Sequence, residues 1–251
     1  MQGSERPFDS QAALVTGAGG DIGAAIVEAL AARGAAVGLV DRRLRGLSRV
    51  ARLIGGDTHV FAVDLTADDQ VRSTVRTFLR HFGQLDILVH SNGTHRAGLL
   101  AEAKMADFDR LWAANVRAPF LLTQLLLPSL RASSGQIAFV NSGRVLTTRV
   151  GTGQFTATQH ALRSLTDTLR MELNPEGIRV LSVYPGRTAT RRSRKVTAQE
   201  GEVYRPERLL QPADIARVVV ESLALPRTAE VTDIIIQPML KPRYGERQPD
   251  A

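Results

Sequence analysis

Residues 16–23 read T-G-A-G-G-D-I-G, between the apolar run A-A-L-V of residues 12–15 and a segment with apolar residues at three- and four-residue spacing. In this context glycines let the backbone turn tightly and approach a pyrophosphate, and the amides at the helix N-terminus stabilise its charge. Gly17, Gly20 and Gly23 have the spacing Gly-x-x-Gly-x-x-Gly. The stretch therefore predicts a strand, turn and helix that bind a dinucleotide through Gly17, Gly20, Asp21, Ile22 and Gly23.

Apolar runs of strand length alternate with longer segments of helical period along the rest of the chain. We predict seven strands, at residues 12–16, 35–40, 59–63, 85–90, 136–141, 179–184 and 232–237. We predict six helices, at residues 21–33, 42–54, 68–82, 107–130, 153–174 and 212–225. This alternation requires crossover connections, which give a parallel sheet with helices on both faces. The expected fold is α/β, a single Rossmann-type doubly wound domain over residues 1–251 with a seven-stranded parallel sheet.

Size and composition fit one domain, because 251 residues with 43% hydrophobic side chains can build one sizeable core. The chain has no cysteine, which excludes disulfides, a thiolate nucleophile and a Cys-based zinc site, and we predict no metal site. No run approaches the length needed to cross a bilayer, and the first residues lack the apolar core of a secretory signal. We therefore expect a cytoplasmic protein without a membrane partner.

The net charge is +7, and only three of the 32 basic residues are lysines. Basic residues cluster in residues 187–195, within a segment, 187–208, that shows no regular period and that we predict to be a substrate lid. The cluster either covers an anionic substrate or is simply solvated. The cluster does not predict a nucleic-acid interface, since no aromatic residues are interleaved with the arginines. Residues 244–251 are predicted to be a disordered tail.

Asp41 ends the second predicted strand, where its carboxylate can bind ribose hydroxyls and repel a 2′-phosphate. This favours NAD(H) as the cofactor. Arg42 and Arg43 follow directly and can contact a phosphate, so NADP(H) is not excluded. Asp21 lies inside the glycine turn, where it either caps the helix favourably or repels the pyrophosphate.

Further motifs lie after the other strands. They are Asp64 and Leu65, the H-S-N-G stretch with Asn92 and Gly93, Asn115, Ser142, and the P-G-R-T-A-T stretch with Pro185, Gly186, Thr188 and Thr190. Together with the glycine turn, they make the chain resemble the short-chain dehydrogenase/reductase family from residue 11 to residue 238. The resemblance implies that Asp64 meets the adenine, that residues 90–93 brace the site, and that residues 185–190 hold the nicotinamide amide.

The family resemblance also implies a Ser that polarises the carbonyl, a Tyr that exchanges the proton, and a Lys that lowers the Tyr pKa. Counting along the family spacing from Ser142 places Phe155 at the Tyr position and Gln159 at the Lys position. The helical pattern continues after Gln159, and no Tyr lies between residues 84 and 183, so a shifted alignment does not restore the pair. We therefore interpret the chain as a divergent member that lacks this Tyr and Lys.

Loss of the general acid leaves Ser142 and Asn115 as the remaining catalytic candidates. Three substitutes for the proton donor stay open: Tyr184 beside the nicotinamide turn, His95 after the fourth strand, and a hydroxyl of the substrate. His160 is discounted, because it is turned about 100° away from Gln159 on a helix.

We predict an NAD(H)-binding oxidoreductase that reduces or oxidises a carbonyl or hydroxyl group of a small molecule by a nonstandard route. The alternative is a catalytically inactive nucleotide-binding protein, a sensor or an inactive partner in an oligomer. The family resemblance implies a homo-oligomer, a tetramer or a dimer, in which residues 153–174 take part.

Overall fold

The computed structural model describes residues 6–240, and the predicted tail at residues 244–251 lies outside them. One seven-stranded sheet has the order β3-β2-β1-β4-β5-β6-β7, and every neighbouring pair is parallel. The strands are β1 (Ala12–Thr16), β2 (Ala36–Asp41), β3 (Thr58–Ala62), β4 (Ile87–His90), β5 (Gln136–Val140), β6 (Arg179–Pro185) and β7 (Asp233–Ile236). The α/β fold with a seven-stranded parallel sheet is confirmed.

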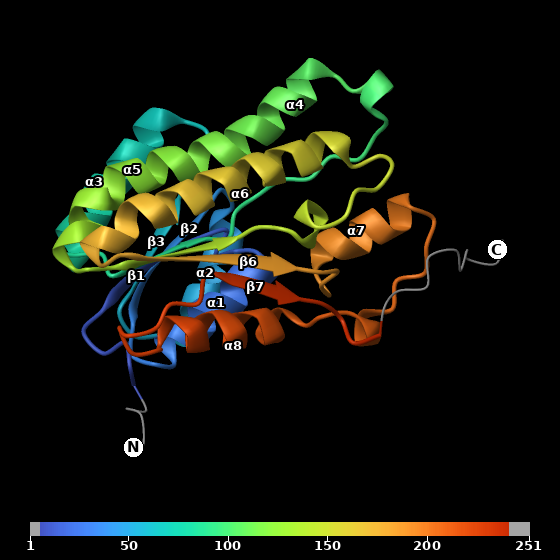
Figure 1. Cartoon of the computed structure of the whole chain (residues 1–251). Coiled ribbons are helices and arrows are strands. Elements are labelled where there is room, and N and C mark those ends of the chain that lie inside the picture. Colours follow the sequence, from blue (N-terminus) through green and yellow to red (C-terminus); the bar gives the residue numbers. More distant parts are fainter. Residues whose placement is uncertain (1–5, 241–251) are drawn as a thin grey trace.

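Helices cover both faces of the sheet (Figure 1). One face carries α1 (Asp21–Ala31), α2 (Leu44–Ile54) and α8 (Pro212–Leu223), and the other carries α3 (Asp68–Phe82), α4 (Met105–Trp112), α5 (Ala118–Ala132) and α6 (Gly153–Leu173). Successive residues of β1 alternate between the two cores: Ala13 and Val15 pack under α1 and α8, and Leu14 packs under α3 and α5. All five β1 residues are buried, as expected for a strand covered on both faces.

The predicted helix at residues 107–130 is interrupted in the structure. It consists of α4, a π-helical turn (Ala113–Arg117) and α5. Single π turns inside α-helices are rare, and those that occur are often found at functional sites. Asn115 lies in the middle of this turn and is buried.

The prediction of irregular structure for residues 187–208 is corrected, because this segment contains the helix α7 (Arg191–Gln199). Thr190 caps α7 by accepting a hydrogen bond from the Ser193 amide at 3.0 Å. Helical periodicity did not reveal α7, because its sequence is mostly polar and has no apolar stripe. In Figure 1, α7 lies beyond the carboxyl ends of β6 and β7.

No helix within residues 6–240 combines the length and apolar character needed to span a membrane. Over the same residues, no group of three or more His, Cys, Asp or Glu side chains is arranged to hold a metal ion.

Candidate active site

The glycine turn is packed against the loop that follows β4. Gly17 has φ +66°, and a Cβ there would lie 2.6 Å from the Ser91 carbonyl oxygen. A Cβ on Gly23 would lie 2.2 Å from the Gly17 carbonyl oxygen. Both positions therefore require glycine. The Thr16 hydroxyl, which donates to Asn92 Oδ1 at 2.7 Å, fixes the same two loops to each other.

The backbone amides at the N-terminus of α1 are directed at the glycine turn. Gly20 is the N-cap residue, and its amide donates to the Gly17 carbonyl at 2.9 Å. Ile22 is partly buried and packs on the core below α1. The helix N-terminus is thus held in the arrangement that binds an anion.

Carboxylates line the adjoining strand ends. Asp41 accepts from the Arg43 amide at 3.1 Å through Oδ1, while its Oδ2 has no hydrogen-bond partner among the described residues. Hydrogen bonds from the Thr66 amide and hydroxyl, with a smaller contribution from Arg42, lower the pKa of Asp64. Both carboxylates are therefore able to accept hydrogen bonds from a ligand in this cleft.

Asp21 does not cap α1 through its side chain, as the sequence suggested it can. Its carboxylate instead accepts from the Arg191 amide at 2.8 Å and from Arg191 Nε at 2.9 Å. Arg191 also donates to the Gly19 carbonyl at 2.9 Å, and Arg192 donates to the Gly93 carbonyl. The first turn of α7 thus bridges the glycine turn and the loop after β4.

These residues fit a dinucleotide. Gly17 and Gly23 cannot carry side chains, the amides of α1 are directed at the turn, and the free Asp41 oxygen lies at the end of the neighbouring strand. Leu65, which follows Asp64, is buried beneath the same edge of the sheet.

Ser142 follows β5 at the carboxyl edge of the sheet. Its Oγ accepts from the Arg144 amide at 3.2 Å, and its hydroxyl proton has no acceptor among residues 6–240. Asn141 Oδ1 accepts from the Ser142 amide at 2.7 Å, which fixes the backbone at this point. The Ser142 hydroxyl is therefore positioned and available to donate to a ligand.

Asn115 joins three elements through one buried side chain. Its Nδ2 donates to the Thr94 carbonyl and to Thr158 Oγ1, each at 3.0 Å, and its Oδ1 accepts from the Thr94 amide at 2.7 Å. The π turn is what directs this amide between the loop after β4 and α6. Asn115 thereby fixes the loop that carries the next residue, His95.

His95 lies against Phe155. The ring centroids are 4.8 Å apart in an edge arrangement. Burial, followed by the positive charges of Arg192 and Arg144, lowers the pKa of His95, while Glu200 opposes the shift. The imidazole is therefore mainly neutral near pH 7 and can accept a proton.

Gln159 is buried one turn after Phe155 on α6. Its amide nitrogen donates to Thr158 Oγ1 at 3.4 Å, and its backbone carbonyl accepts from Asn141 Nδ2 at 3.2 Å. Gln159 thus contributes to the packing between α6 and the end of β5 and supplies no charge.

Tyr184 points beneath α6. The Arg163 guanidinium lies over its ring, 5.6 Å from the centroid, and its hydroxyl is buried without a hydrogen-bond partner in the described chain. Burial raises the pKa of Tyr184. A tyrosine in these surroundings is less suited than His95 to exchange a proton.

The turn that follows β6 is tightly built. A Cβ on Gly186 would lie 2.3 Å from Gln237 Oε1, and the Thr188 hydroxyl donates to the Gly186 carbonyl at 3.0 Å. Pro185 ends β6, and Thr190 begins α7 as its cap. The predicted nicotinamide turn therefore leads directly into the helix that reaches the glycine turn.

The short chain dehydrogenase family model matches residues 11–201. The chain belongs to the short chain dehydrogenase family. An uncharacterized oxidoreductase of Staphylococcus aureus (strain USA300) is 30% identical over 229 residues, which cover 90% of this chain and 96% of the relative.

Solved structures agree with the family. A metagenomic short-chain oxidoreductase in complex with NADP is 30% identical, has a TM-score of 0.80, and matches 93% of this chain and 100% of its own. A 3-ketoacyl-(acyl-carrier-protein) reductase from Brucella melitensis complexed with NADH is 28% identical and has a TM-score of 0.82. The match covers 92% of this chain and 98% of the reductase. This short chain dehydrogenase family member therefore has oxidoreductase relatives and structural neighbours that bind NADP or NADH.

In this family member, four charges hold α7 and the residues after it to the loop before α6. Arg149 contacts Glu200 at 2.9 Å and Glu202 at 3.2 Å, and Arg187 contacts the same two carboxylates at 2.6 and 3.3 Å. We call these four residues the lid clasp. Their side chains are 12–30% exposed, so solvent screens them less than surface pairs.

Sequence reasoning did not identify the lid clasp or Arg144. Arg149 and Glu200 are 51 residues apart, and nothing in the local pattern of either segment indicates that they meet. The sequence predicts His95 as a candidate proton donor, but its pattern does not indicate the contact between His95 and Phe155.

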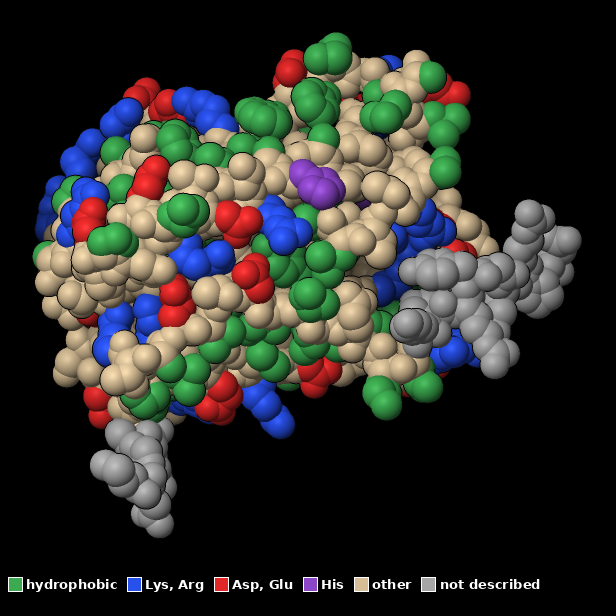
Figure 2. Space-filling model, viewed as in Figure 1, with side chains coloured by type: hydrophobic (Ala, Val, Ile, Leu, Met, Phe, Trp, Pro, Cys, Tyr) green, Lys and Arg blue, Asp and Glu red, His purple; other side chains and the backbone are tan. Residues whose placement is uncertain are grey.

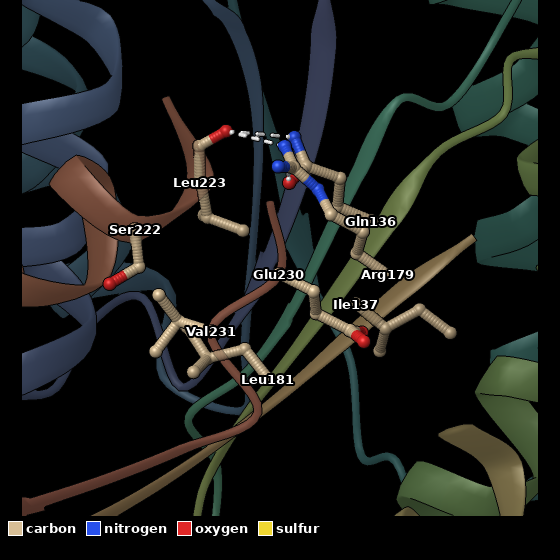
Figure 3. A pocket seen from close by; sticks show the side chains of 8 residues that line it. All are labelled: Gln136, Ile137, Arg179, Leu181, Ser222, Leu223, Glu230 and Val231. Atoms are coloured by element: carbon tan, nitrogen blue, oxygen red, sulfur yellow. Dashed lines mark hydrogen bonds between the residues drawn. The ribbon is translucent and has the colours of Figure 1, made fainter. Parts of the chain in front are cut away.

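A small cavity lies at the opposite, amino end of the sheet (Figure 3). Gln136 and Arg179, the first residues of β5 and β6, both donate to the Leu223 carbonyl, at 3.1 and 3.0 Å. Arg179 also donates to Gln136 Oε1 at 2.6 Å. These hydrogen bonds attach the end of α8 to the sheet, which is a structural role, and Arg179 Nε is left buried without a partner in the described part of the chain.

Proposed function

We propose that this protein is an NAD(H)-dependent oxidoreductase that acts on a carbonyl or hydroxyl group of a small molecule, with His95 in place of the family's tyrosine. The contact between His95 and Phe155, where the family spacing counted from Ser142 predicts the tyrosine, carries the proposal. When bound, the nicotinamide supplies a hydride for reduction or accepts one in oxidation.

Ser142 and Asn115 provide the fixed part of the machinery. The free Ser142 hydroxyl donates to the substrate oxygen and stabilises the negative charge that develops there. Asn115 acts by positioning, because it holds the backbone of Thr94, the residue directly before His95.

His95 moves the proton. In oxidation its neutral imidazole takes the hydroxyl proton of the substrate, and in reduction its protonated form returns one. Arg192 and Arg144 supply positive potential near His95, where Gln159 has no charge to offer.

The cofactor preference rests on Asp41. Its free Oδ2 suits ribose hydroxyls, and its charge disfavours a 2′-phosphate. Asp21 is compatible with a cofactor diphosphate because Arg191 compensates its charge. We expect NADH to bind about tenfold or more tightly than NADPH, since a buried like-charge contact typically costs at least that much.

Two variants test the proton route. His95→Gln should lower kcat/KM by about 100-fold or more, the usual effect of removing a general acid or base, whereas His160→Gln on the exposed face of α6 should not. Adding Phe155→Tyr with Gln159→Lys to His95→Gln should restore activity on diketones. A His95→Gln enzyme as active as the parent would contradict the role of His95.

A catalytically inactive nucleotide-binding protein is the second candidate. The observation that favours it is that Arg191 and Arg192 bridge the cofactor cleft between the glycine turn and Gly93. Such a protein binds NADH in calorimetry and shows no hydride transfer to any carbonyl compound, including in the Phe155→Tyr/Gln159→Lys variant.

A further inference from the structure

The charges around His95 do not balance. Five arginines lie in or beside the site, and only three carboxylates pair with them in the described chain. The arginines are Arg144, Arg149, Arg187, Arg191 and Arg192, and the carboxylates are Asp21, Glu200 and Glu202. The lid clasp and the Asp21–Arg191 pair use every one of these carboxylates, which leaves Arg144 and Arg192.

Arg144 lies just after the carboxyl end of β5, two residues beyond Ser142. Its amide donates to Ser142 Oγ at 3.2 Å, it is half-buried, and its guanidinium has no carboxylate partner among residues 6–240. A half-buried guanidinium without a counter-ion is unfavourable, because its desolvation is not repaid by a partner. An anion bound beside Ser142 would supply the missing partner.

Arg192 reaches the same loop from α7. It donates to the Gly93 carbonyl, two residues before His95, and no described carboxylate lies within ion-pair distance of it. Both arginines act on His95 electrostatically. In Figure 2, Lys and Arg side chains gather on the surface formed by α7.

The position of Arg144 separates it from the cofactor diphosphate. The glycine turn follows β1, and Ser142 follows β5, with β4 between them in the sheet. Neighbouring strands are about 4.8 Å apart, so these two points are about 10 Å from each other. Arg191 and the α1 N-terminus already serve the diphosphate end, and Arg144 is left for the substrate end.

We infer that the substrate is a small oxo acid or hydroxy acid, whose carboxylate Arg144 binds while Ser142 and His95 act on the neighbouring carbonyl or hydroxyl. Arg192 adds positive potential on the α7 side. A guanidinium binds a carboxylate through two parallel hydrogen bonds, which gives both affinity and orientation. This inference rests on the proposed function.

The test compares small 2-oxo acids with their methyl esters, which have the same carbonyl and no negative charge. With NADH, the wild-type protein should prefer the acid by about 100-fold in kcat/KM, since a site built for a charged group rejects an analogue that leaves it unpaired. Arg144→Gln should lose this preference, because KM should rise much more for the acid than for the ester. Arg194→Gln, on the exposed side of α7, is the matched control.

Binding gives a readout that does not need turnover. Oxamate, a carboxylate analogue of a 2-oxo acid, should bind the NADH complex of wild-type protein and of Arg194→Gln in calorimetry, and should bind Arg144→Gln at least about tenfold more weakly. Equal turnover of acid and ester, or equal oxamate binding with and without Arg144, overturns the inference while the proposed function stands. Turnover of diketones without turnover of acids or esters likewise overturns the inference, whereas absence of turnover with acids, esters and diketones alike overturns the proposed function instead.

Discussion

His95 meets Phe155 in an edge arrangement with ring centroids 4.8 Å apart, and the proposed proton route rests on this contact. A phenyl ring has no ionisable proton, and Gln159 has no charge, so neither residue can act as the acid. The His95 imidazole beside them can exchange a proton, and burial together with Arg192 and Arg144 lowers its pKa, which favours the neutral form.

The pH dependence of turnover follows from the lowered pKa of His95. The neutral imidazole acts as the base, so kcat/KM for alcohol oxidation should rise with pH and then stay constant. Because the pKa of His95 is lowered, this plateau should begin at a pH lower than about 6.5, the ordinary histidine value. Reduction needs the protonated form and should fall about tenfold per pH unit above the His95 pKa. Initial rates between pH 5 and 9 check both limbs. An oxidation rate that keeps rising above pH 8 would point to a different base.

His90, at the end of β4, should make the protein sensitive to acid. It is fully buried, its Nε2 is 2.9 Å from Thr123 Oγ1, and burial lowers its pKa to about 3. The pKa of His90 in the folded protein lies below its unfolded value of 6.5. The contribution of neutral His90 to the free energy of unfolding is therefore fully present above pH 6.5 and is lost as the pH falls towards 3. Between pH 7 and 5 this loss is about 2 kcal/mol.

Urea unfolding at pH 7 and pH 5 measures this loss. The free energy of unfolding differs between pH 7 and pH 5, and this difference should be about 2 kcal/mol smaller in His90→Gln than in the wild type. It should be unchanged in His160→Gln, whose side chain is exposed. The same pH difference in the wild type and in His90→Gln would show that His90 does not account for the acid sensitivity.

The positions of the glycines in the turn could be predicted from the sequence, because only glycine fits where the backbone turns tightly against another segment. Gly17 and Gly23 stand where any Cβ would meet a carbonyl oxygen. The partner of Asp21 was not predictable. Arg191 lies 170 residues away, and only the folded chain brings the two together.

At the scale of elements, α7 reaches across from β6 to the glycine turn. The lid clasp fixes its far end, and Arg191 and Arg192 fix its first turn. The sequence predicted a lid over residues 187–208 but not this helix, since a mostly polar helix without an apolar face has no periodic signal. Its role as a lid remains a prediction.

Compensation of Asp21 by Arg191 predicts a coupled effect on cofactor binding. Arg191→Met should weaken NADH binding by about tenfold, because the Asp21 carboxylate then faces the diphosphate without a counter-charge. Asp21→Asn combined with Arg191→Met should recover most of the loss. Calorimetric titration of the single and double variants measures this, with Arg194→Met as the control. Equal binding by Arg191→Met and the double variant would contradict the coupling.

The π turn in the middle of the central helices shows a second limit of sequence reasoning. Residues 107–130 have a continuous helical pattern, and the structure keeps them helical. What periodicity does not show is the extra residue per turn that directs Asn115 at Thr94 and Thr158.

For the molecule as a whole, the strand and helix alternation was sufficient to predict the sheet. Buried parallel strands are continuous apolar runs, and right-handed crossovers leave few possible orders. The observed order reverses direction at β1 and β4, so the carboxyl-end crevice forms there, between the glycine turn and the loop with His95.

We expect a homotetramer formed through the central helices. Large apolar side chains are exposed on them, among them Phe120 of α5 at 41% and Met171 of α6 at 80%. Phe120→Asp with Met171→Asp should reduce the mass found by sedimentation, whereas Leu53→Asp on α2 should not. A monomeric wild-type protein at micromolar concentration would contradict this expectation.

Transfer of deuterium from NADH labelled at the nicotinamide C4 position tests the oxidoreductase proposal most directly. Incubation at pH 5.5 with a panel of small 2-oxo acids should give a hydroxy acid with one deuterium, detected by mass spectrometry, at a rate about 100-fold lower in His95→Gln. NADH that binds the protein but passes no deuterium to any of the acids, their methyl esters or diketones would contradict the proposed reaction and favour a nucleotide-binding protein without turnover.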